Sequence, residues 1–94
     1  MEDTLMEELI ENLVRAGLNP SFFEIIDESS LHAGHAGARP SGETHYRITV
    51  VSDEFSGLSR VARQQSVYAL LDEAFARGLH ALTMRTITPD EFTD

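Results

Sequence analysis

Cysteine and lysine are both absent from this sequence of 94 residues. Without cysteine, the chain forms no disulfide and builds no metal site from thiolates of its own. No apolar run approaches the roughly 20 residues that span a bilayer. The start, MEDTLMEE, is acidic where a signal or transit peptide is basic. We therefore expect no membrane segment and a cytoplasmic location.

Basic charge is scarce and unevenly spread. Seven arginines face 16 acidic residues, which gives a formal net charge of −9. Residues 1–28 carry eight acids and one arginine, whereas residues 29–85 carry six arginines and five acids. Binding to nucleic-acid phosphates needs a concentrated basic face, and this distribution does not favour one.

The chain has the apolar content of one globular domain, 41%, and we expect a single domain over residues 1–94. TLMEELIENLVRAG has apolar residues at helical spacing, with Thr4 and Glu7 as a capping box and Gly17 as the stop. A second helix is predicted from its cap at Ser59 through Arg77, with Gly78 as the stop. Its buried stripe is Val67, Leu70, Leu71, Ala74 and Phe75.

Three stretches are typical of strands: FFEIID (22–27), THYRITVVS (44–52) and HALTMRTI (80–87). The first two are joined by a loop and should run antiparallel; the last two are joined by a helix and should run parallel. A capping box at Thr88 and Glu91 predicts a short C-terminal helix. The expected fold class is α+β, in the order α-β-β-α-β, with a three-stranded mixed sheet and helices packed on one face.

The histidines are the candidate functional residues. LHAGHAGARPSGETHY contains His32, His35 and His45, and His80 opens the third predicted strand. Because parallel neighbouring strands begin at the same edge of a sheet, the histidine-bearing loop, His45 and His80 should meet at one rim.

Each histidine also has a simpler interpretation. His32 and His35 lie among small residues and equally fit a solvated loop. His80 follows a helix end, where the helix dipole favours an imidazole. We interpret His45 as structural and hydrogen-bonded to nearby backbone.

Two or three histidines without a thiol make a poor metal site on their own. Zinc prefers four ligands, and Asp27 and Glu28 are the nearest carboxylates that could complete a set. A shared site, in which a partner supplies sulfur, is the better fit, because mixed histidine and cysteine ligation of a [2Fe–2S] cluster is established chemistry in Rieske centres. No arrangement of residues indicates an enzyme. Arg60 and Arg63 are the candidate nucleic-acid contacts, weighed against a solvated helix face.

Several ordered motifs together resemble the BolA family. They are DES followed by LHAGHAG, then GETHYRITVVSDEFSG, RQQSVY and GLHALTMRTITPDE. The resemblance covers nearly the whole chain, residues 1–94, and implies a fold similar to the class II KH domain.

The resemblance implies a non-catalytic partner of a monothiol glutaredoxin. The heterodimer would hold a [2Fe–2S] cluster with glutathione and the glutaredoxin's cysteine, and the isolated chain would carry none. The histidine of Leu-His-Ala-Leu, here His80, and a loop histidine would be the ligands on this side. Counting from Glu28 selects His32, whereas counting back from His45 selects His35, which shares more of its surroundings with the family.

The same family is associated with a second function, DNA-binding transcriptional regulation through the region of the second helix. The family pattern there is close to Arg-His-Arg, whereas this chain has Arg63, Gln64 and Gln65. Together with the acidic net charge, this departure disfavours DNA as a partner.

Overall fold

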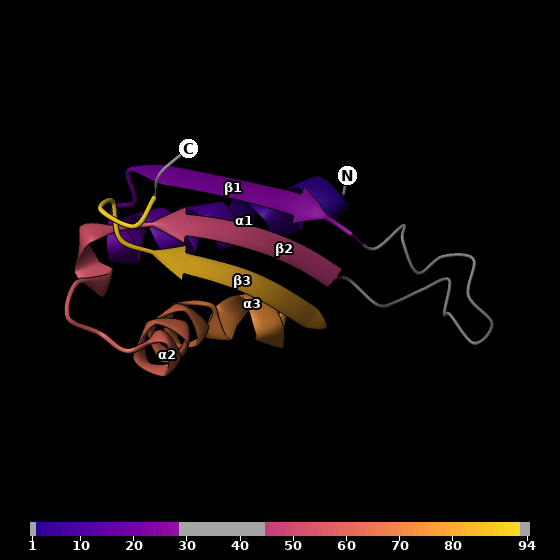
Figure 1. Ribbon diagram of the computed structural model, residues 1–94. Coiled ribbons are helices and arrows are strands. Elements are labelled where there is room, and N and C mark those ends of the chain that lie inside the picture. The colour runs from indigo at the N-terminus through magenta and orange to yellow at the C-terminus, as the bar shows by residue number, and fades with distance from the viewer. Residues whose placement is uncertain (1, 29–44, 93–94) are drawn as a thin grey trace.

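The computed structural model describes residues 2–28 and 45–92. The elements, in chain order, are helix α1 (Glu2–Leu18), strands β1 (Phe22–Asp27) and β2 (His45–Val51), the 3-10 turn η2 (Asp53–Phe55), helices α2 (Arg60–Leu70) and α3 (Asp72–Ala76), and strand β3 (Ala81–Ile87). The strands form one sheet in the order β1-β2-β3, with the helices on one face (Figure 1). β1 and β2 pair antiparallel and β2 and β3 pair parallel, so the predicted α+β fold is confirmed.

The core lies between the helices and one face of the sheet. Alternate residues of the central strand, Tyr46, Ile48 and Val50, are fully buried, as the two-residue period of a strand requires. They pack with apolar residues from the helices and turns: Ile10, Val14, Leu18, Phe55, Val67, Leu71, Ala74 and Leu79. The opposite face of the sheet carries the other set of alternating side chains, and no helix of residues 2–28 or 45–92 lies over it (Figure 1).

Helix α1 departs from the prediction at both ends. It begins at Glu2, before the predicted cap at Thr4, and continues through Gly17 to Leu18. The stop is Asn19, whose φ of 45° lies in the left-handed region and whose N–H donates to the Arg15 carbonyl at 3.1 Å. Gly17 instead permits close helix packing, because a Cβ there would lie 2.4 Å from a methyl group of Leu70. Within residues 2–28 and 45–92, no helix is long and apolar enough to cross a membrane.

The second predicted helix is divided in two. Ser59 caps α2 as predicted, its hydroxyl accepting from the Ala62 N–H at 3.1 Å. The single helix predicted through Arg77 is interrupted at Leu71, which separates α2 from the five-residue α3. Leu71 is fully buried, so the apolar stripe continues across the break and stays against the core.

The predicted C-terminal helix is a single turn. Residues 89–91 form a turn, and the Phe92 N–H donates to the Thr88 carbonyl at 3.1 Å. The capping box itself is present: the Thr88 N–H donates to Glu91 at 3.1 Å and the Glu91 N–H donates to the Thr88 hydroxyl at 3.3 Å. Within the described residues, which end here at Phe92, the capping box is therefore followed by a single turn and not by a longer helix.

Candidate functional site

The end of β1 and the starts of β2 and β3 lie at the same edge of the sheet (Figure 1). We call this edge, made by Glu28, His45, His80 and Ala81, the His80 rim. His45 is the partner of Ala81 across β2 and β3, and the Glu28 N–H donates to the His45 carbonyl at 2.8 Å. Glu28 and His45, the described residues on either side of 29–44, are therefore adjacent, and His45 pairs directly with Ala81, the residue that follows His80, as the topology predicts.

His80 is brought to the rim by the way in which α3 ends. Gly78 has a φ of 121°, its N–H donates to the Phe75 carbonyl at 3.2 Å, and the Leu79 N–H donates to the Ala74 carbonyl at 3.0 Å. These two bonds are the pattern of a Schellman motif, which accepts a glycine at this position and packs the next apolar residue. Leu79 is accordingly buried, and His80 beside it is exposed. β3 begins at Ala81, so His80 immediately precedes the strand that the sequence predicted it to open.

Four polar side chains, which we call the rim cluster, link all three strands at this edge: Glu28, His45, Arg47 and Thr83. Arg47 Nε donates to a Glu28 carboxylate oxygen at 2.9 Å, and His45 Nε2 lies 3.8 Å from the other oxygen. His45 Nε2 also lies 3.2 Å from the Thr83 hydroxyl. His45 was predicted to hydrogen-bond to nearby backbone, whereas these contacts of its ring are to the side chains of Thr83 and Glu28. Thr83 and Arg47 were not predicted as site residues, although strand alternation places both on the face that His45 occupies.

The loop histidines His32 and His35 lie outside the described residues. Among the described residues, no group of three or more histidine, aspartate or glutamate side chains is arranged to hold a metal. Glu28, a candidate to complete a zinc site, is engaged with Arg47. The described residues at the rim offer one exposed imidazole, that of His80. The shared-cluster hypothesis and the zinc hypothesis through His32, His35 and His80 both stay predictions.

Comparison with known proteins identifies the family. Residues 14–91 match the family model described as BolA-like protein. The chain belongs to the BolA-like family. It is 35% identical over 88 residues to a protein of Escherichia coli (strain K12) named DNA-binding transcriptional regulator BolA, a match that covers 94% of this chain and 80% of the relative.

BolA structures share the fold. BolA1 from Arabidopsis thaliana superposes with a TM-score of 0.80 at 33% identity, covering 94% of this chain and 96% of that chain. The BolA domain of SufE1 from the same plant gives a TM-score of 0.76 at 40% identity, over 88% of this chain and 91% of that chain. BolA folds therefore occur both as separate proteins and as a domain of a SufE-like protein.

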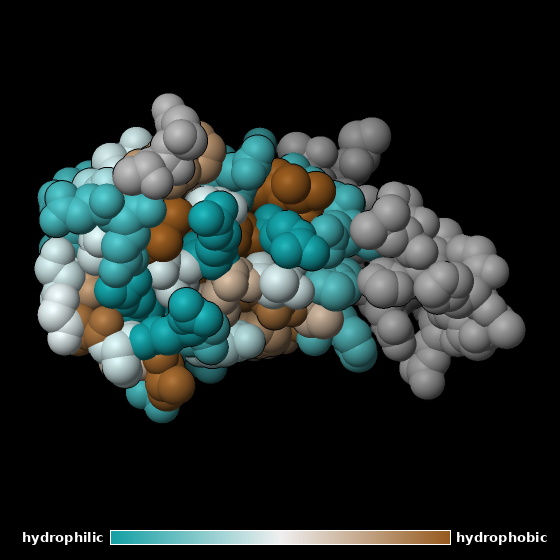
Figure 2. All heavy atoms as spheres, viewed as in Figure 1, coloured by the Kyte–Doolittle hydropathy of each residue, from teal (hydrophilic) through white to brown (hydrophobic). Residues whose placement is uncertain are grey.

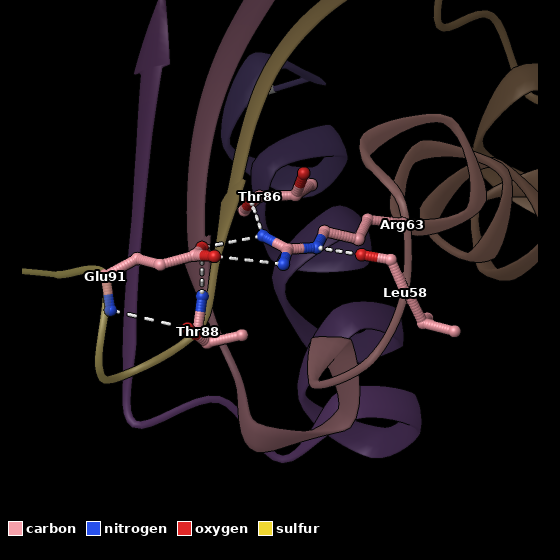
Figure 3. Close-up of polar contacts among 5 residues, drawn as sticks. All are labelled: Leu58, Arg63, Thr86, Thr88 and Glu91. Atoms are coloured by element: carbon pink, nitrogen blue, oxygen red, sulfur yellow. Dashed lines mark hydrogen bonds and ion pairs between the residues drawn. The ribbon is translucent and has the colours of Figure 1, made fainter.

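The second helix of this BolA fold carries the two arginines named as nucleic-acid contacts. Arg63 points toward the C-terminal turn (Figure 3) and donates to the Leu58 and Thr86 carbonyls, each at 3.0 Å. Its two terminal nitrogens hold the Glu91 carboxylate at 2.7 and 3.1 Å. The side chain of Arg63 is only 13% exposed, so a phosphate would have to displace Glu91. Arg60, at the start of α2, is exposed.

The Arg63–Glu91 pair has no local sequence pattern that would predict it, because its partners are 28 residues apart. The hydrogen bonds from Arg63, and then that from the Thr88 N–H, lower the pKa of Glu91 to about 2. The same carboxylate raises the pKa of Arg63. The charge of Arg63 is therefore paired with Glu91 within the fold. Its contact with nucleic acid stays a prediction, and the geometry does not favour it.

Proposed function

We propose that this BolA-family chain is a non-catalytic partner of a monothiol glutaredoxin. In the heterodimer, the two proteins share a [2Fe–2S] cluster that is passed on in iron–sulfur trafficking or read in iron-dependent regulation. His80 supplies one imidazole, and His35 or His32 supplies the other. The sulfur ligands are the glutaredoxin's cysteine and glutathione.

The observation that carries the proposal is the position of His80. The residue is exposed at an edge that also holds both ends of the histidine-bearing segment, and the buried Leu79 fixes its approach. The chain has no cysteine, so a cluster held here needs sulfur from another molecule. The imidazole of His80 is exposed, so a partner that carries the sulfur can approach it.

Replacing thiolate ligands with imidazole changes the charge and the reduction potential of the cluster. A neutral imidazole carries no charge, so exchange of two thiolates for two histidines makes the cluster less negative and raises its reduction potential. A partner that offers histidines therefore changes the redox behaviour of a glutaredoxin cluster. This effect suits a protein that delivers or senses clusters.

The test is to titrate the chain into a glutaredoxin loaded with its [2Fe–2S] cluster and to follow visible circular dichroism. We expect a new spectrum that saturates at one chain per cluster and is lost in His80→Ala. Arg85→Ala is the matched control, because this exposed residue lies on β3, the strand that follows His80, and makes no ion pair within the described part of the chain. The single variants His32→Ala and His35→Ala identify the loop ligand. A spectrum that does not change on mixing, or that survives in His80→Ala, contradicts the proposal.

The alternative function is DNA-binding transcriptional regulation. The name of the Escherichia coli relative favours it, and so does the absence of acidic residues from 55 to 71, a stretch that includes the exposed Arg60. Duplex binding would weaken with salt, its log affinity falling by about 0.9 per phosphate contact against log salt. Arg60→Ala should reduce that slope. Undetectable binding at low salt eliminates this function.

A further inference from the structure

Tyr68, near the end of α2, is the most exposed aromatic residue of the chain, at 45%. Its ring lies against that of Phe75 on α3, and the two ring centroids are 5.9 Å apart. Phe75 packs in turn against the core. A tyrosine supported in this way offers a rigid apolar surface that stays open to water on its outer side.

The end of α3 links this exposed ring to the His80 rim. The Phe75 carbonyl accepts the Gly78 N–H at 3.2 Å, and His80, two residues later, is exposed. Gly78 has no side chain, and the side chain of Arg77 is paired with Glu73 one turn back. A protein that is bound at the imidazole of His80 can therefore also reach the exposed aromatic ring.

Val61 lies on the same exposed face of α2, but at the other end of the helix. It is 62% exposed and precedes Tyr68 by seven residues, which is about 10 Å along the helix axis. Because β2 ends at the far side of the sheet and β3 begins at the His80 rim, α2 runs back toward that rim (Figure 1). Hydrophobic atoms reach the surface over α2 (Figure 2). Of these two exposed residues, Tyr68 is the one nearer His80.

Packing within the chain gives a weak reason for an aromatic ring at position 68. Stabilisation follows the apolar area removed from water, and nearly half of Tyr68 stays in water. Tyrosine is, however, enriched among the residues that dominate the binding energy of protein interfaces. A partner that supplies sulfur to a cluster held by His80 has to lie against the surface around that histidine, because both proteins bind the same cluster.

We propose that Tyr68 is the apolar contact through which this chain docks the glutaredoxin beside the shared cluster. Phe75 supports the ring from behind, and the glutaredoxin covers its outer side. The inference rests on the proposed function and adds to it a docking residue that does not bind the cluster.

The test is to titrate Tyr68→Ala into the cluster-loaded glutaredoxin and to follow visible circular dichroism. Val61→Ala is the matched control, because it removes an exposed apolar side chain from the same helix face away from the rim. We expect Tyr68→Ala to bind about tenfold more weakly than wild type and to give the wild-type spectrum at saturation. Tyr68→Phe and Val61→Ala should both bind like wild type. A melting curve of each isolated variant checks that it is folded.

A second measurement keeps the tyrosine and serves if Tyr68→Ala fails to fold. The chain has two tyrosines, and Tyr46 is fully buried, so labelling with fluorotyrosine gives one buried and one exposed fluorine. In the isolated chain, the ¹⁹F signal of Tyr68 should shift between light and heavy water, because its fluorine contacts solvent. In the cluster complex this solvent isotope shift should be lost.

The outcomes separate the two proposals. If wild type forms no His80-dependent cluster complex, the proposed function fails and the docking role fails with it. If wild type forms the complex, equal affinities of Tyr68→Ala and Val61→Ala, or an isotope shift that persists in the complex, overturn the docking role while the proposed function stands. A different spectrum of Tyr68→Ala at saturation also overturns it, because Tyr68 would then act by placing His80 rather than by contacting the partner.

Discussion

The guanidinium of Arg63 on α2 holds both carboxylate oxygens of Glu91, 28 residues later, at 2.7 and 3.1 Å (Figure 3). The same guanidinium donates to the Thr86 carbonyl on β3. One side chain thus fastens the second helix to the edge strand and to the C-terminal turn. This contact explains why the capping box at Thr88 and Glu91 stays ordered although no helix follows it.

Glu91→Gln should lower the free energy of unfolding at neutral pH. It should also remove part of the loss of stability that wild type shows as the pH falls. The pKa of Glu91 is lowered from 4.5 to about 2 in the fold, so its carboxylate stabilises the native state fully above about pH 4.5. That contribution is lost as the pH falls from 4.5 toward 2. Melting temperatures of wild type and Glu91→Gln should therefore differ at pH 7 and converge near pH 2.

Glu24→Gln is the control for this pH dependence, because its carboxylate is exposed and makes no ion pair within the described residues. It should follow wild type across the whole range. A difference between Glu91→Gln and wild type that stays constant from pH 7 to 2 would show that the ionised carboxylate is not what fastens the turn.

Gly17→Ala should destabilise the chain although alanine favours helices. The helix gains about 1 kcal/mol from the exchange, but the new Cβ would lie 2.4 and 2.6 Å from the two methyl carbons of Leu70. Overpacking of this kind costs about 1–3 kcal/mol, so we expect a net loss of about 1 kcal/mol in urea denaturation.

The effect of Gly17→Ala on stability should reverse in sign when Leu70 is replaced by alanine. In a Leu70→Ala background the clash is gone, and Gly17→Ala should then stabilise by up to about 1 kcal/mol. Equal effects in both backgrounds would mean that contact with Leu70 is not the reason why alanine is unfavourable at position 17.

Gly78→Ala tests whether the end of α3 places His80. The φ of 121° is a conformation that L-residues rarely adopt, and among the described residues no atom beyond the chain neighbours of Gly78 lies within 4 Å of the added Cβ. The cost is therefore backbone strain, about 1–3 kcal/mol. We expect both a lower free energy of unfolding and a weaker cluster complex with glutaredoxin.

Gly57 provides the matched control, since its φ is 80° and the space beside it is also open. Gly57→Ala should destabilise by a similar amount, but it lies beyond the opposite end of β2 from the His80 rim and should leave the cluster spectrum unchanged. If both variants weaken the complex equally, loss of stability rather than displacement of His80 is responsible.

The strands were predictable because their pattern is local. FFEIID forms β1 over the predicted residues, and the alternation of Tyr46, Ile48 and Val50 gave the buried face of β2. Once the parallel pairing of β2 and β3 was inferred, the meeting of His45 and the start of β3 at one edge followed from topology alone.

The ends of the helices were harder to predict because tertiary contacts decide them. Gly17 resembles a helix stop, yet it lies inside α1 where Leu70 approaches, and Asn19 ends the helix instead. The break at Leu71 and the Arg63–Glu91 pair likewise depend on partners far away in sequence. The rim cluster could be predicted only in part. The sequence singled out His45, but its contacts with Glu28 and Thr83 depend on the register of all three strands.

The most direct measurement is electron spin echo spectroscopy of the reduced complex, with this chain labelled with ¹⁵N-histidine and the glutaredoxin unlabelled. We predict coupling of the cluster to labelled imidazole nitrogen, with the coupling from His80 lost in His80→Ala and retained in Arg85→Ala. A cluster without any coupling to nitrogen from this chain would contradict the account.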